Sequence, residues 1–116
     1  MNLPLHIMAT AHCLPIQQVS SAELDEKLGL AKGKVEKVGG VKTRYFAKPQ
    51  ETAAQLAAEA ARKALLKSGL DWQEIDALVA FSATMDQGMP SNAALIHREL
   101  GLSATEFRRL ISMLLV

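Results

Sequence analysis

The chain has 116 residues, and its 13 lysines and arginines nearly balance its 12 aspartates and glutamates, so the formal net charge is +1. This balance gives no reason to expect nucleic acid or an anionic membrane as the main partner. The single cysteine, Cys13, excludes a disulfide within the chain, which fits a reducing compartment.

The first part of the chain predicts a strand followed by a short helix. Residues 5–14 are rich in Ile, Ala and Thr, and we expect a strand there. Residues 19–28 predict a helix, because Ser20 and Glu23 have the spacing of a capping box. Gly29 is placed to end that helix.

A connector and a second strand are expected next. Residues 31–38 are charged and only weakly helical, and Gly39-Gly40 marks a turn. Residues 41–46 alternate apolar and polar side chains, which predicts a half-exposed strand or an extended arm.

The strongest pattern in the chain is a long helix followed by a short turn and a strand. Thr52 and Gln55 form a second capping box, and Gly69 is placed to end the helix. Its predicted apolar face consists of Leu56, Ala57, Ala60, Ala61, Ala64 and Leu65. Residues 75–84 contain four consecutive apolar side chains, which predicts a strand buried on both faces. A helix followed so closely by a buried strand indicates an α/β protein.

The last part predicts a loop, a helix and a tail of uncertain type. Gly88 lies in the loop, Ser91 is a good N-cap, and Gly101 ends the helix. The apolar face of this helix consists of Ala93, Ile96, His97 and Leu100. Residues 105–116 fit either a strand or a helix.

The two ends of the chain give no sign of export or of membrane insertion. The N-terminus lacks the charged and apolar segments of a signal peptide. The apolar stretch 110–116 is far shorter than the ~20 residues that a membrane helix needs. We therefore expect a soluble cytoplasmic protein of one domain, or part of one.

Six segments in order carry a resemblance to a known family: CLP, SAEL, GGVKTRYFA, ETAAQLAAEAARKAL, SGLDWQEIDALVAFSAT and MPSNAALIHRELGL. In this order and spacing, the chain resembles the N-terminal part of the β-ketoacyl-acyl-carrier-protein synthase III enzymes as far as about Phe107. The resemblance implies a partial thiolase-like α/β fold, with a mixed sheet and packed helices, and it assigns residues 1–116 to the N-terminal portion of a ketosynthase domain. It would cover only about the first third of a member.

The resemblance also implies a chemistry, namely decarboxylative condensation in fatty acid or polyketide-type biosynthesis. In the family, a cysteine takes an acyl group from coenzyme A, and a histidine and an asparagine help to decarboxylate malonyl on its carrier protein. Acyl-CoA and an acyl carrier protein are thus the expected substrate and partner. The resemblance implies no covalently bound cofactor. It also implies that the protein forms a homo-oligomer.

The chain departs from the family pattern at the positions that carry this chemistry. Arg108 and Arg109 follow Phe107, and Met113 stands where the nucleophile would. A thioether cannot form the thioester, so we expect no catalytic residue here and no condensation by this chain alone. Lys34 stands where many members have a tryptophan that stacks on the adenine of coenzyme A.

One position has a tolerable match to a substrate-binding residue. Met89 precedes Pro90-Ser91, where the family has a residue that reaches into the acyl pocket of the neighbouring subunit. Met89 is therefore the single site residue that the sequence predicts.

Other chemically capable residues have simpler interpretations. Cys13 is expected to be an inert, at least partly buried thiol, and His97 a packed or interface histidine. The three histidines have no metal-binding spacing, so no metal site is expected. The pair Arg108-Arg109 fits a solvated tail better than a carrier-protein contact.

Three functions stay open from the sequence. The first is part of a synthase III-like acyltransferase that is inactive alone. The second is a non-catalytic dimerisation or interaction module derived from that family. The third, a small α/β protein that binds acyl-CoA or a nucleotide, is the least favoured, because no Gly-rich phosphate loop follows a strand.

Overall fold

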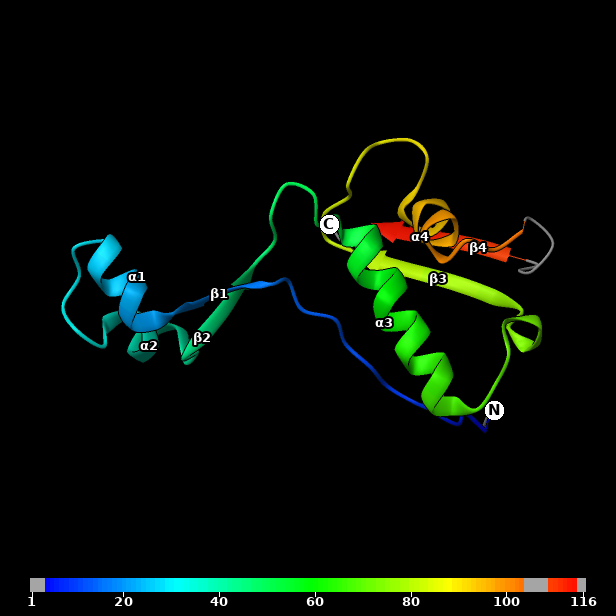
Figure 1. Cartoon of the computed structure of the whole chain (residues 1–116), viewed down its shortest axis with the longest axis horizontal. Coiled ribbons are helices and arrows are strands. Elements are labelled where there is room, and N and C mark those ends of the chain that lie inside the picture. Colours follow the sequence, from blue (N-terminus) through cyan, green and yellow to red (C-terminus); the bar gives the residue numbers. More distant parts are fainter. Residues whose placement is uncertain (1–3, 104–108, 115–116) are drawn as a thin grey trace. The chain divides into compact units, whose positions relative to one another are not determined.

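The structure is a computed structural model that describes residues 4–103 and 109–114. Contacts between Cα atoms divide the described chain into two compact units. The small unit is Leu14–Glu51, and the large unit consists of the described residues before and after it. Figure 1 shows both units in the colours of the sequence. Each is described by itself.

The small unit is a strand pair with two short helices. Strand β1 (Gln17–Ser20) pairs antiparallel with β2 (Thr43–Phe46), and helices α1 (Ser21–Lys27) and α2 (Lys34–Gly39) connect them. The predicted half-exposed strand is thus confirmed in β2. Helix α2 lies in the weakly helical connector and extends one residue into the turn predicted at Gly39-Gly40.

The predicted capping box of α1 is present. The amide of Glu23 donates to Ser20 Oγ over 3.2 Å, and the amide of Ser20 donates to Glu23 Oε2 over 2.8 Å. The hydrogen bond from the Ser20 amide, followed by one that the Ser20 hydroxyl donates to Glu23 Oε2 over 2.9 Å, holds the pKa of the Glu23 carboxyl below its ordinary value, because both favour the charged form. Gly29 follows the helix with a φ of 63°, as predicted for a helix end.

A second carboxylate braces the two ends of the small unit. Glu51 accepts hydrogen bonds from the amide of Lys48 over 2.9 Å and from the amide of Ile16 over 3.0 Å. The Lys48 amide, followed by the Ile16 amide, holds the pKa of Glu51 below its ordinary value. The segment before β1 is therefore tied to the segment after β2.

The predicted strand over residues 5–14 is wrong. The described residues 4–14 are in no regular element, and Ile7 and Leu5 are 84% and 89% exposed. A strand needs a neighbour to receive its backbone hydrogen bonds, and no strand pairs with this segment in the described chain. The polar link that the structure shows there runs from Lys67 Nζ to the carbonyl oxygen of Thr10, over 3.4 Å.

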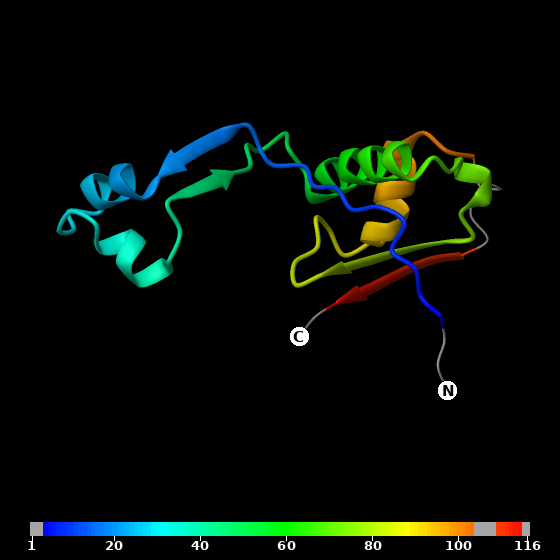
Figure 2. The same ribbon diagram turned by 90° about the horizontal axis from the view of Figure 1, so that it is seen from below.

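The large unit places two helices over a parallel strand pair. Helix α3 (Ala53–Ser68) leads through the short 3₁₀ helix η1 (Trp72–Glu74) into β3 (Ala77–Ser82), and α4 (Asn92–Leu100) precedes β4 (Arg109–Leu114). Strands β3 and β4 pair in parallel, so residues 109–114 of the ambiguous tail form a strand. Figure 2 shows α3 and α4 on the same side of this pair. The chain thus holds an antiparallel and a parallel ladder in two separate sheets.

The ends of α3 are as predicted, and its buried face is as predicted only in part. The capping box of Thr52 and Gln55 is present, and Gly69 ends the helix in the left-handed conformation. The residues that the fold buries are Ala54 and Ala58, with 3% and 0% exposed. The six predicted residues are half-buried, and Ala57 and Ala61 pack against the same core, so the predicted face is centred about a quarter turn from Ala54 and Ala58. Alanines lie on several sides of this helix, so its period did not identify the side that α4 covers.

Helix α4 follows its prediction closely, and it forms most of the core with α3. Ala93 is 0% exposed, and Ile96 and Leu100 are also buried. Two side chains of one carbon, Ala58 and Ala93, let the two helices approach closely. Within the described residues, no helix is long and apolar enough to cross a membrane.

Strand β3 is covered on one face, whereas the sequence predicted two. Ala80 is buried and belongs to the core with α3 and α4, but Val79 and Phe81 are 56% and 59% exposed. The exposed residues alternate with the covered ones, as the two-residue period of a strand requires. In the described chain, α3 and α4 lie over one side of the strand pair, and Val79 and Phe81 form an apolar face of β3 that is more than half open to solvent.

Candidate functional site

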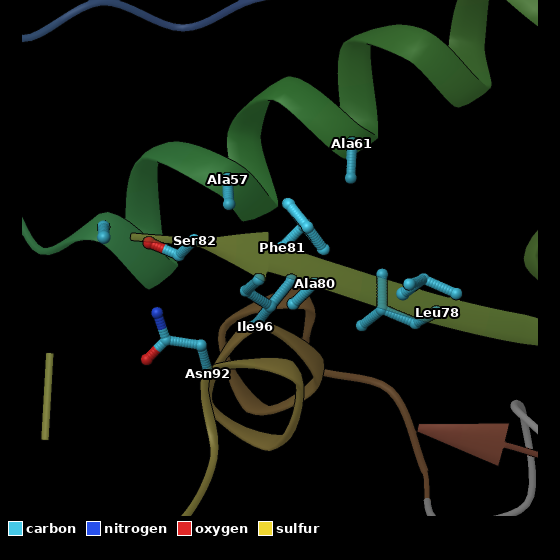
Figure 3. A pocket seen from close by; sticks show the side chains of 10 residues that line it. Ala57, Ala61, Leu78, Ala80, Phe81, Ser82, Asn92 and Ile96 are labelled. Carbon is cyan, nitrogen blue, oxygen red and sulfur yellow. The ribbon is translucent and has the colours of Figure 1, made fainter. Parts of the chain in front are cut away.

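A pocket of about 400 Å³ lies in the large unit between α3, β3 and α4. Figure 3 shows Ala57 and Ala61 of α3 on one side of it and Ile96 of α4 on the other, with β3 between them. The space exists because alanines face it, where longer side chains would fill it. The pocket is mainly apolar, with two polar side chains, Ser82 and Asn92, at one end.

A loop connects the carboxyl end of β3 to the start of α4, beside the polar end of this pocket. The predicted site residue Met89 lies in this loop, with 85% of its surface exposed. Met89 does not line the pocket. Its exposure fits a side chain that acts on another molecule better than one that completes a site in its own unit.

Two residues that the sequence analysis missed anchor the loop. Asp86 accepts hydrogen bonds from the amides of Ala53 and Ala54 at the start of α3, over 2.9 and 2.8 Å. The amide of Asp86 donates to Oδ1 of Asn92, over 3.2 Å, and Asn92 is 5% exposed. An aspartate in a Gly/Pro-containing loop was a signal for a backbone contact, but its partners in α3 are more than 30 residues away and could not be read from the sequence.

The position expected for a nucleophile lies on the strand next to this pocket. Met113 is in β4 and pairs with Phe81 of β3, which lines the pocket. Phe107 and Arg108, where the family pattern is lost, lie outside the described residues. Cys13 is partly buried, as expected, and it does not line the pocket.

The remaining predicted positions are not brought together. His97 on α4 is partly buried, and its Nε2 lies 3.1 Å from the carbonyl oxygen of Ser103, which suits a packed histidine. Lys34 lies in the small unit, where it lines a groove of about 290 Å³ with Val38 and Arg44. Among the residues that the structure describes, no three His, Cys, Asp or Glu side chains are close enough to hold a metal ion.

Curated relatives give the chain its place among known proteins. No family model matches it. It is 37% identical over 97 residues to a protein named β-ketoacyl-[acyl-carrier-protein] synthase III from Neisseria meningitidis, which covers 84% of this chain and 30% of the relative. A protein of the same name from Roseobacter denitrificans is 32% identical over 103 residues, covering 89% and 32%. The chain thus spans about a third of the length of these relatives.

Solved structures agree with this relationship. A variant of OleA from Xanthomonas campestris superimposes with a TM-score of 0.78 and 25% identity, covering 94% of this chain and 33% of that one. AbyA1, described as a tetronic acid condensing enzyme, has a TM-score of 0.74 and 28% identity, covering 90% and 34%. By sequence and by thiolase-like fold, the chain therefore belongs to the β-ketoacyl-acyl-carrier-protein synthase III family, of which it matches about a third of a member's length.

Proposed function

We propose that this chain is the N-terminal scaffold of a synthase III-type condensing enzyme. The observation that carries the proposal is the 37% identity over 97 residues to proteins of that name. The proposed reaction joins an acyl group from acyl-CoA to malonyl on an acyl carrier protein, in the cytoplasm and without a covalently bound cofactor. The enzyme would be a homo-oligomer.

Within this proposal the large unit has two roles. The α3–β3–α4 core holds β4 beside β3, so that the Met113 position is fixed next to the pocket. The loop presents Met89 to a second copy of the chain, where a flexible thioether suits contact with an apolar acyl chain. The chemistry itself needs a thiolate, a histidine and an asparagine that these 116 residues do not supply at matching positions.

The first test is for turnover. We expect the purified chain, given acyl-CoA and malonyl-carrier protein, to form no 3-oxoacyl product and no acyl adduct, because Met113 cannot form a thioester and Cys13 lies away from the pocket. Product is measured by mass spectrometry of the carrier protein, and the adduct by intact mass of the chain. A full-length synthase III is the positive control. Product above the protein-free control would overturn the proposal that this chain alone is inactive.

The open apolar face of β3 favours a second candidate, a non-catalytic association module. Val79 and Phe81 leave more than half of their surface exposed, and contiguous exposed apolar surface commonly marks a protein interface. The two candidates differ in which surface a second copy covers. The synthase proposal places Met89 against the partner, and the module places the β3 face there.

Spin labels on three exposed positions separate these candidates. In a Cys13→Ser background we expect a nitroxide at Met89→Cys to lose mobility as protein concentration rises, while one at Leu66→Cys does not. Leu66 is the matched control, because its exposed fraction of 84% equals that of Met89 within 1%. Loss of mobility at Val79→Cys but not at Met89→Cys would favour the module. If the chain sediments as a monomer at every concentration tested, both proposed modes of association are wrong.

A further inference from the structure

The loop that carries Met89 has almost no apolar packing of its own. Every residue from 83 to 90 is exposed. Loops of this kind are held by hydrogen bonds or not at all, because they bury too little apolar surface to offset the entropy of ordering. What fixes Met89 must therefore be sought among the polar contacts of the loop.

Those contacts converge on Asp86. Both of its carboxylate oxygens accept backbone amides, those of Ala53 and Ala54, at the N-terminus of the 16-residue helix α3. This helix end carries a partial positive charge, which favours an anionic partner. The amide of Asp86 also binds the buried side chain of Asn92 at the start of α4. Asp86 is thus held by α3 on one side and by α4 on the other, three residues before Met89.

One further hydrogen bond connects Met89 to this ordered part of the loop. Nε2 of Gln87 donates to the carbonyl oxygen of Met89 over 2.6 Å, which links the residue after Asp86 to the site residue itself. Ser82 and Thr84 make a local turn at the other end of the loop, where the Thr84 amide donates to Ser82 Oγ over 3.2 Å. Among the bonds that the structure describes for this loop, those to the distant helix α3 are made by Asp86.

Helix α3 has a cap of its own. Thr52 Oγ1 accepts the amide of Gln55 over 3.2 Å, and Oε1 of Gln55 accepts the amide of Thr52 over 3.1 Å. The start of the helix is therefore satisfied by two separate devices, one local and one from the loop. Only the second bears on where Met89 lies.

We propose that Asp86 is a positioning residue, whose carboxylate clamps the β3–α4 loop to the N-terminus of α3 and so fixes Met89 for its contact with a partner copy. The inference rests on the proposed role of Met89. It goes beyond that role by naming the residue through which the loop is ordered. Asp86 touches no reacting group and acts only through the backbone that it holds.

Thr52→Ala and Asp86→Asn form a matched pair for testing this, because each removes acceptors from the same helix end. Asparagine keeps the size of the side chain but has one acceptor oxygen, so it cannot receive both amides. The readout is the backbone ¹⁵N order parameter of Gln87, Gly88 and Met89, measured on the whole chain without ligand. These should fall from the rigid value of about 0.85 to below about 0.6 in Asp86→Asn, and stay high in Thr52→Ala.

The controls keep the result decisive. Order parameters along α4 should not change in either variant, which shows that the unit is folded. Asp86→Ser, whose hydroxyl can accept one amide, should give an intermediate loss and serves as the second variant if Asp86→Asn does not fold. A loop that stays ordered in Asp86→Asn, or that loosens equally in Thr52→Ala, would overturn the proposal and leave Asp86 a helix cap only. The order parameters are measured at a protein concentration at which the chain is a monomer, so neither substrate nor a partner copy contributes, and this outcome is independent of the turnover and spin-label tests.

Discussion

Replacing Ala58 by leucine should lower the free energy of unfolding of the large unit by about 3 kcal/mol, which is at the upper end for an overpacked core position. Ala58 is 0% exposed and faces α4, where Ala93 is also 0% exposed. Three more carbon atoms have no space between two helices that approach through alanines. The helices must separate, or the leucine must adopt a strained rotamer.

The same substitution three residues further along the same helix is the matched control. Ala61 lines the 400 Å³ pocket, so the leucine of Ala61→Leu can extend into space that is already there. We expect its effect to be within about 1 kcal/mol of zero, since cavity filling offsets any local strain. Urea denaturation followed by circular dichroism measures both variants. Equal losses in the two, or a larger loss in Ala61→Leu, would mean that α3 turns a different face to the core.

That comparison also shows where sequence reasoning reached its limit on the fold. The start and end of α3 were predictable, because Thr52, Gln55 and Gly69 act within one turn of the chain. The side of the helix that is buried depends on α4, which lies 24 residues beyond the end of α3. Because α3 has alanines on most sides, the difference in hydrophobicity between its faces is too small to identify the buried side from the sequence.

The strands show the same limit more strongly. The apolar run of β3 was predicted as a strand, but which faces are covered depends on elements elsewhere in the fold. Residues 5–14 have a strand-like composition and form no strand in the described chain, since nothing there pairs with them. The spacing of apolar residues in 105–116 did not distinguish a strand from a helix. Residues 109–114 form β4 because they pair in parallel with β3, some 30 residues earlier in the chain.

The candidate site was accessible only in part. Met89 was found through a family resemblance, and its exposed fraction of 85% is consistent with a residue directed at another molecule. Asp86 and Asn92 were missed because their hydrogen bonds join a loop to two helices. Those contacts are consequences of the fold, and local patterns do not encode them.

Replacing Asp25, a buried aspartate of the small unit, by alanine should lower the stability of helix α2 by about 3 kcal/mol. Asp25 is 3% exposed, and its two oxygens accept the amides of Gly33 and Val35, over 2.7 and 2.9 Å. Helix α2 begins at Lys34 after a glycine without a side-chain cap, and the Lys34 amide donates to the carbonyl oxygen of Ala31. The Asp25 carboxylate therefore holds the amides on either side of Lys34. Alanine removes two part-buried hydrogen bonds to a carboxylate, and a hydrogen bond to a charged group contributes roughly 1.5–3 kcal/mol.

Hydrogen exchange at α2 measures this directly, because a loss of 3 kcal/mol corresponds to a rate increase of about 100-fold. The amides of Lys37 and Gly40, which bond to Gly33 and Glu36, should exchange faster by that factor. Amides within α3 belong to the other unit and should keep their rates. Glu26→Ala is the matched control, since its exposed side chain lies next to Asp25 on α1, and it should change the rates at α2 less than threefold. Unchanged exchange at α2 in Asp25→Ala would show that the carboxylate does not cap this helix in solution, and the small unit would then depend on the β1–β2 ladder and the Glu51 brace instead.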